Sequence, residues 1–259
     1  SATPLKKRNR MKKWTTAIIL GGVVVGGYFA FPRSTPIGDF RVVLNAHVDG
    51  EKLVFNEFVY ENPNGPGQFM VQDFRFFVSN ITLNDGETGF AEPDSYHLAR
   101  FDNAENTFEI IIKDVPLVGV SQIGFSIGLD PAANSSTESR GDLDPNSRMA
   151  WNWEVGYKFV LFEGSLRVEN ETFPLVYHIG FDENQRHLSF DSAVNTGPEI
   201  RLNVNIMALF NGVNPIDLHH LQSVKFDRID ARSLTDNYGS MIAPQINRGG
   251  APNIFDNQG

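Results

Sequence analysis

The sequence predicts an all-β fold: an antiparallel β-sandwich with a short C-terminal helix, preceded by a single N-terminal transmembrane helix. Three observations support this prediction. From Asp39 onward, short runs rich in β-branched and aromatic residues alternate with turn residues. Long stretches with helical spacing are few, which favours a sandwich or barrel over a parallel α/β sheet. Before them lies one long uncharged segment, Trp14 to Phe31.

The uncharged segment has the properties of a membrane anchor. As a helix, Trp14 to Phe31 would span about 27 Å, close to the roughly 30 Å hydrocarbon core of a bilayer. Six basic residues precede it without any acid, and only Arg33 follows soon after. The positive-inside rule then predicts a cytoplasmic N-terminus and a periplasmic or extracellular body.

A cleaved signal peptide is the alternative for this segment. The segment is longer than a usual signal-peptide core and ends at Tyr28–Pro32 without a small-x-small cleavage site, which favours a retained, single-pass anchor in the inner membrane. The predicted order is a basic cytoplasmic tail (1–13), the anchor (14–31), a linker (32–38), the β-sandwich domain (39–245) and a C-terminal tail (246–259).

Four glycines lie within the anchor, Gly21, Gly22, Gly26 and Gly27, and Gly22 with Gly26 forms a small-xxx-small pair. Such pairs let a second helix pack closely. A glycine-rich spanning helix without a partner is the other interpretation, and the sequence leaves both open.

The body contains at least nine predicted strands, separated by turn residues such as Asn62–Gly67 and Asn195–Pro198. The predicted strands are Phe40–Ala46, Lys52–Tyr60, Phe69–Leu83, Phe108–Ile112, Ser121–Leu129, Tyr157–Glu163, Thr172–Ile179, His187–Phe190 and Ile200–Ile206. Asp130–Arg148 reads as an irregular connection. Ser233–Ala243 has apolar residues at helical spacing and is predicted to be the short C-terminal helix. We find no internal repeat and no interior domain boundary.

Charge and composition exclude several functions. The net charge is −9, and removing the six basic residues of the tail from the 22 Lys and Arg leaves 16 against 31 Asp and Glu, or −15. A body with this much negative charge repels the phosphate backbone of nucleic acids, and we therefore expect no nucleic-acid partner. The chain has no cysteine, which excludes disulfides, thiolate metal sites and a catalytic thiol.

Common catalytic motifs are absent from the sequence. It contains no HExxH, GxSxG, GxGxxG or P-loop, and we therefore predict that the protein is not an enzyme. His47, His97 and His178 fall in or beside predicted strands. A histidine in a strand needs partners for its ring nitrogens, either a metal or hydrogen bonds, and for each residue taken alone the structural role is the more common.

Two tryptophans, Trp151 and Trp153, lie two residues apart in Met149–Phe159. In a strand both would face the same side and form one large apolar, oxidisable surface. The structural interpretation is that both tryptophans pack in the sandwich core, because tryptophan pairs usually contribute buried apolar surface.

Six segments taken together carry a family resemblance. They are FRFFVSNITL (Phe74–Leu83), DSYHLARFD (Asp94–Asp102), IGFSIGLDPAANSS (Ile123–Ser136), MAWNWEVGYKFVLFEG (Met149–Gly164), FPLVYHIG (Phe173–Gly180) and LTDNYGSM (Leu234–Met241). In this order they resemble the MbnP-like family, copper-binding periplasmic proteins associated with methanobactin operons. The resemblance runs from about Phe40 to Ala243, so the sandwich domain is MbnP-like.

The resemblance implies a site and a partner. In that family, histidine nitrogens hold one copper ion, and a tryptophan oxidised to kynurenine by a partner di-haem enzyme contributes to the site. Carried onto this sequence, the implied metal ligands are His47, His97 and His178, and the tryptophans that could become kynurenine are Trp151 and Trp153.

Two functions follow from these observations. The first is a membrane-anchored, periplasmic, non-enzymatic copper-binding protein. The second is an accessory subunit of a multi-subunit membrane complex, respiratory or photosynthetic, that docks on its periplasmic face with a vestigial metal site. The second follows from the anchor, because a retained helix keeps the domain beside something in the membrane.

Overall fold

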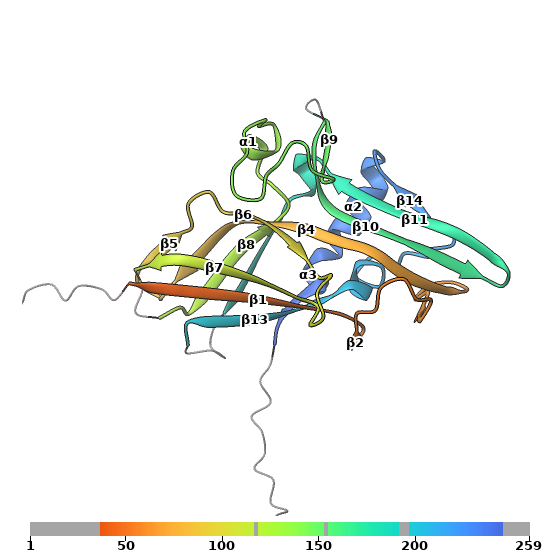
Figure 1. Cartoon of the computed structure of the whole chain (residues 1–259), viewed down its shortest axis with the longest axis horizontal. Coiled ribbons are helices and arrows are strands. Elements are labelled where there is room, and N and C mark those ends of the chain that lie inside the picture. The colour runs from red at the N-terminus through yellow and green to blue at the C-terminus, as the bar shows by residue number, and fades with distance from the viewer. Residues whose placement is uncertain (1–36, 117–118, 153–154, 192–196, 246–259) are drawn as a thin grey trace, which may run out of the picture. The chain divides into compact units, whose positions relative to one another are not determined.

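Two β-sheets share one hydrophobic core in this protein (Figure 1). The computed structural model describes residues 37–116, 119–152, 155–191 and 197–245, which all belong to one compact unit. The strands are β1 Gly38–Val48, β2 Glu51–Lys52, β3 Tyr60–Glu61, β4 Gln68–Asn84, β5 Gly89–Ala91, β6 Tyr96–Arg100, β7 Thr107–Val115, β8 Gln122–Ile127, β9 Ala150–Asn152, β10 Gly156–Val168, β11 Glu171–Gly180, β12 Arg186–Asp191, β13 Glu199–Asn205, β14 Ser223–Val224 and β15 Ile242–Pro244. The helices are α1 Pro131–Asn134, η1 Asp182–Asn184, η2 Ile206–Leu209, α2 Arg228–Asp236 and α3 Tyr238–Met241.

The smaller sheet has the order β15-β13-β1-β2, with β7 on the other side of β1. The larger sheet has the order β12-β8-β4-β10-β11-β14, with β3, β5 and β6 also paired to β4 and β9 paired to β10. Alternate residues of each long strand enter the shared core, as Val42, Leu44 and Ala46 of β1 do. This alternation confirms the predicted sandwich.

The antiparallel prediction is wrong for two strand pairs. β1 runs parallel to β13, and β11 runs parallel to β14. Parallel neighbours need a long connection, and here β1 and β13 are separated by most of the domain. All other pairs of named strands are antiparallel within the described residues.

Eight of the predicted strands lie within β1, β4, β7, β8, β10, β11, β12 and β13, give or take a few terminal residues. The predicted strand Lys52–Tyr60 is wrong, because only its ends belong to strands, β2 and β3, and between them Phe55 forms a single isolated bridge with Val71. Asn56 lies between them with a φ of 64°, a left-handed conformation that interrupts an extended chain. The side chain of Asn tolerates this conformation better than most.

The C-terminal helix begins earlier than predicted and is interrupted. α2 begins at Arg228, after the N-cap Asp227, whose carboxylate accepts hydrogen bonds from the amides of Ile229 and Asp230. α3 follows after Asn237, and the chain then enters β15. Asn237 is fully buried, so the break between α2 and α3 is a packed part of the structure.

A second, smaller core covers the outer face of the larger sheet. Leu143 and Met149 of the 130–150 connection pack there against Phe77, Phe159 and Leu161. This segment, predicted as an irregular connection, is therefore a covering layer. β10 is consequently buried on both faces along its first half, which explains its nearly continuous apolar sequence.

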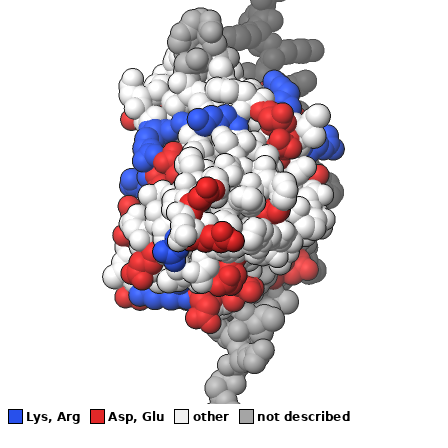
Figure 2. Space-filling model, turned by 90° about the vertical axis from the view of Figure 1, so that its right-hand side faces the viewer, with Lys and Arg blue, Asp and Glu red and all other residues white. Residues whose placement is uncertain are grey.

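Among the described residues, no helix is long and apolar enough to cross a membrane. The predicted anchor at residues 14–31 lies outside those residues, as do the basic tail and the C-terminal tail. On the face seen in Figure 2, acidic side chains are interspersed with basic ones. The described residues on that face form no continuous basic surface of the kind that nucleic-acid binding requires.

Candidate metal centre

The three predicted histidine ligands lie on three different faces of the sandwich. His178 of β11 alternates with Tyr177 and Ile179, which enter the main core, so its ring is on the outer face of the larger sheet. His97 of β6 alternates the other way, because Tyr96 and Leu98 belong to the outer, second core. His97 and His178 thus project from opposite faces of one sheet.

His47 belongs to the other sheet. It lies between Ala46 and Val48, which enter the main core, and therefore faces outward from the smaller sheet. Its Nδ1 accepts a hydrogen bond from the Gly50 amide at 2.9 Å. Burial lowers the pKa of His47, and Asp49 partly offsets this effect.

Strand alternation directs the rings of His47, His97 and His178 to different faces, so the structure does not bring these three predicted ligands together. Within the described residues, no group of three or more His, Asp or Glu side chains is placed to hold a metal ion. Each histidine has its own partners instead.

His97 is held by a carboxylate at the edge of the larger sheet. Its Nε2 lies 2.8 Å from Glu92 Oε2, which also accepts a hydrogen bond from Ser95 Oγ at 2.6 Å. Ser95 Oγ in turn accepts the amide of Ile81. The chain of bonds ties the β5–β6 connection to β4, which is a structural role.

His178 also forms a histidine–carboxylate pair, and its side chain is less exposed than that of His97, 14% against 22%. Its Nε2 lies 2.8 Å from Glu163 Oε1 on the neighbouring strand β10. Burial lowers the pKa of His178, although the hydrogen bond to Glu163 acts in the opposite direction. Burial also acts to raise the pKa of Glu163, but hydrogen bonds from His178 and Arg148 outweigh it, and the net pKa is lowered. Near neutral pH the pair is therefore a neutral imidazole donating to a carboxylate.

Cations surround this pair. Arg148, from the covering layer, is hydrogen-bonded to Glu163 and lies 3.2 Å from Asp73 Oδ2. Asp73 also binds Arg75 through both carboxylate oxygens, at 2.9 and 2.7 Å. Lys158 donates to the carbonyl oxygen of Arg148 at 2.6 Å, and burial lowers the pKa of Lys158. The two carboxylates are therefore already compensated by basic groups.

Trp151 lies on the same outer face as His178. A Cβ built on Gly180 would lie 2.6 Å from Trp151 Cζ3, so the indole ring covers Gly180. Gly180 follows His178 by two residues, roughly 7 Å along the same face of β11. The structure thus brings together two of the predicted site residues, His178 and Trp151. Trp153 lies outside the described residues.

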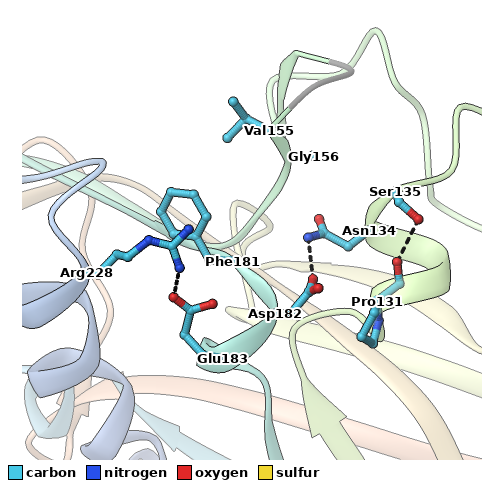
Figure 3. Close-up of a pocket in the computed structure, with 9 residues that line it drawn as sticks. All are labelled: Pro131, Asn134, Ser135, Val155, Gly156, Phe181, Asp182, Glu183 and Arg228. Atoms are coloured by element: carbon cyan, nitrogen blue, oxygen red, sulfur yellow. Dashed lines mark hydrogen bonds and ion pairs between the residues drawn. The ribbon is translucent and has the colours of Figure 1, made fainter.

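Aromatic neighbours fix the indole of Trp151. Its ring centroid lies 5.4 Å from that of Phe181 and 5.1 Å from that of Phe226. Phe181 is also part of the wall of an adjacent pocket of about 240 Å³, shown in Figure 3. The Arg228 guanidinium lies over the Phe181 ring, 4.3 Å from its centroid, and pairs with Glu183.

Sequence reasoning missed the residues that organise this end of the molecule. Asn134 donates to Asp182 Oδ1 at 2.8 Å and accepts the amide of Tyr157 at 2.9 Å, which joins the covering layer to the sheet (Figure 3). Asn134 lies in the family-like segment Ile123–Ser136, so the resemblance marked its position. Glu163 likewise lies in the family-like segment Met149–Gly164, but its pairing with Arg148, which lies outside the six segments, depends on the folded arrangement and had no signal in the sequence.

A donor set for copper is present only in part. His178 is neutral near neutral pH and oriented by a carboxylate, the arrangement usual for a metal-binding imidazole. Within the described residues, His178 belongs to no group of three or more side chains placed to hold a metal ion. Of the predicted site residues, the structure therefore brings together His178 and Trp151 and leaves His47 and His97 elsewhere.

Fold and site together define a class of architecture: a β-sandwich whose larger sheet carries a histidine–carboxylate pair and a tryptophan on its outer face. A family model named MbnP matches residues 37–226, which is more than half of the chain. The chain belongs to the MbnP family.

Comparison with solved structures supports the fold. MbnP from Methylosinus trichosporium superposes with a TM-score of 0.53 at 16% sequence identity, over 75% of this chain and 82% of that one. At this identity the likeness is one of fold. A search of the curated proteins gave no match.

Proposed function

We propose that this chain is a non-enzymatic, copper-binding member of the MbnP family that works from a membrane anchor on the periplasmic side of the inner membrane. The observation that carries the proposal is the placement of Trp151 and His178 on one face of β11. Membership of the family adds support, because the protein it resembles in fold is itself an MbnP.

The chemistry of the proposed site follows from its donors. Neutral imidazole is a good ligand for copper, and Glu163 would hold the His178 ring in one orientation while the other ring nitrogen binds the metal. Oxidation of Trp151 to kynurenine by a di-haem partner enzyme would add an aromatic amine. No thiolate exists in the chain, so the site would not be of the blue-copper type.

Metal analysis of the full-length protein tests this proposal. The native protein should contain copper, and His178→Ala should lose most of it. His47→Ala removes an imidazole on the other sheet and should keep the copper of the native protein. Zn²⁺ also accepts imidazole, so copper and zinc should be measured together. Equal copper in both variants, or none in the native protein, would contradict the proposed site.

Intact mass spectrometry tests the role of tryptophan. Conversion of one tryptophan to kynurenine adds a few daltons. In the native host, Trp151→Phe should remove this increment, whereas Trp153→Phe should keep it. The reverse outcome would move the modification to Trp153 and away from His178.

A second candidate function is that of an accessory subunit docked on a membrane protein complex. It is supported by an exposed patch of two apolar residues close in sequence, Phe226 and Ile229, which are 58% and 80% exposed, and the Phe226 ring lies beside Trp151. Exposed apolar patches are typical of protein contacts. Copper binding and docking are compatible, because the patch and the proposed metal ligand are different residues.

A further inference from the structure

One long edge of the smaller sheet has no partner strand within the described residues. β7 pairs with β1 alone, and the backbone groups on its other side join no strand. An unpaired edge presents a row of N–H and C=O groups on which another strand can add. The other ends of this sheet, β2 and β15, are only two and three residues long.

The side chains of β7 alternate between core and solvent. Ile110 and Ile112 are buried in the main core. Glu109, Ile111 and Lys113 face solvent, and Ile111 is 44% exposed, which is unusual for an isoleucine. The solvent-facing side chains of β7 are therefore, in order, acidic, apolar and basic: Glu109, Ile111 and Lys113.

This sequence is complementary to itself, and we propose that a second copy of the chain pairs with β7 in the antiparallel direction, centred on Ile111. Residues opposite each other across an antiparallel pair point to the same face. In this register Ile111 meets Ile111 of the second copy, and Glu109 meets Lys113 twice, once on each side of the two-fold axis. Such an interface is isologous and closes after two copies.

Neighbouring charges favour the same register. On β1, Arg41 Nε binds Glu109 Oε1 at 2.6 Å, and Asp39 binds Lys113. Pairing about Ile111 would extend these contacts into a row of alternating sign, Asp39, Lys113, Glu109 of the second copy and its Arg41. A shift by one residue would turn the buried set of one copy outward, and a shift by two would place Glu109 opposite Ile111.

The edge strand β12 of the larger sheet lacks this property. β12 pairs only with β8, and its charged residues Arg186 and Asp191 are an odd number of positions apart. The side chains of Arg186 and Asp191 therefore point to opposite faces of the sheet. If two copies paired through β12 in one continuous sheet, these two charges could not meet across the two-fold axis. The self-complementary pattern of β7 is therefore absent from β12.

The pairing would be short. A register shift in the β1–β7 pairing and a φ of 54° at Asp114 end the regular part of the edge just after Lys113. Bulges of this kind turn an edge away from further pairing. We therefore expect a reversible dimer that is best detected by cross-linking.

Cysteine cross-linking tests the proposal directly, because the full-length chain contains no cysteine of its own. In Ile111→Cys, the two introduced thiols would face each other across the axis, within the distance that a disulfide requires. Mild oxidation with diamide in gentle detergent should convert most of this variant to a disulfide dimer. The control is Val213→Cys, at another exposed apolar residue, which should stay monomeric.

Register is tested by a mixing experiment. Glu109→Cys and Lys113→Cys should each fail to cross-link alone and should cross-link when mixed. With Ile111→Cys, Glu109→Lys should suppress the disulfide dimer, and adding Lys113→Glu should restore it. Circular dichroism checks the fold of each variant. If Ile111→Cys cross-links no faster than Val213→Cys, or if Glu109→Cys cross-links alone, the proposed pairing is wrong.

Discussion

The indole of Trp151 covers Gly180 so closely that no side chain fits between them. A Cβ at residue 180 would lie 2.6 Å from Trp151 Cζ3 and 2.5 Å from the carbonyl oxygen of Tyr157. Gly180 is thus the position that lets the tryptophan approach the strand carrying His178. This contact gives a first prediction about the proposed site.

Gly180→Ala should displace Trp151 and destabilise the fold by about 1–3 kcal/mol, the usual effect of adding a methyl group to a packed contact. Urea unfolding followed by tryptophan fluorescence, in a Trp153→Phe background, measures both effects. Gly239→Ala is the matched control, since nothing lies within 4 Å of its added Cβ. Equal unfolding midpoints for the two variants would contradict this prediction.

The His178–Glu163 pair should make stability depend on pH. Burial lowers the pKa of His178 in the folded state, so between that pKa and about 6.5 the unfolded chain binds more protons. The free energy of unfolding should therefore fall as the pH decreases below about 6.5. The lowered pKa of Glu163 adds a further loss below its unfolded value, near 4.5.

The first of these losses is measured by urea titrations at about pH 7.5 and about pH 5.5. His178→Gln should reduce the difference between the two midpoints, and His47, whose pKa burial also lowers, should account for part of the remainder. His220→Gln is the control, because its side chain is 84% exposed. The idea fails if His178→Gln keeps the full difference.

Asn237 should be among the costliest polar side chains to remove. Its Nδ2 donates to the carbonyl oxygens of Leu209 and Asn214, both at 2.9 Å, and its Oδ1 accepts the Asn214 amide at 2.8 Å. Asn237→Ala leaves these buried groups without partners, at a cost of roughly 2–4 kcal/mol. Asn211→Ala, at an exposed position, should cost much less in the same denaturation assay.

The exposed patch should matter for docking and little for folding. Replacing Phe226 and Ile229 with Ser should lower the amount of membrane protein that co-purifies with the full-length chain in mild detergent. Val213→Ser, at another exposed apolar residue, should leave that amount unchanged. Gly22→Leu with Gly26→Leu tests the second predicted contact, in the anchor. If neither the Phe226→Ser, Ile229→Ser variant nor the Gly22→Leu, Gly26→Leu variant changes the amount of co-purified membrane protein, the accessory-subunit function is contradicted.

The sequence predicted the strands well where alternation was long, as in β4, and failed where one residue changed the backbone, as at Asn56. It placed His97 and His178 in strands correctly. It could not assign them to faces, because the face depends on which neighbours enter the core, and that follows from pairing in three dimensions. The resemblance suggested one site, and strand alternation divides it.

The second core was also beyond sequence reasoning. Leu143 and Met149 are single apolar residues in a polar, irregular segment, and no periodicity marks them as buried. For the same reason Arg148, which reaches Glu163 from that segment, could not be recognised as part of the candidate site. A local sequence pattern predicts strands. It does not predict an irregular segment that covers a sheet, because the position of such a segment depends on tertiary contacts.

The parallel pairing of β1 with β13 has a consequence for the order of folding. Arg41 pairs with Glu199, so the first strand of the domain must wait for nearly the last before its sheet is complete. Contacts so distant in sequence slow folding, because the loop must close before its contacts stabilise the fold. During synthesis, one edge of β1 therefore stays unpaired until the C-terminal third emerges. A chain cut short before Glu199 would keep that backbone edge open, as a target for chaperones and proteases.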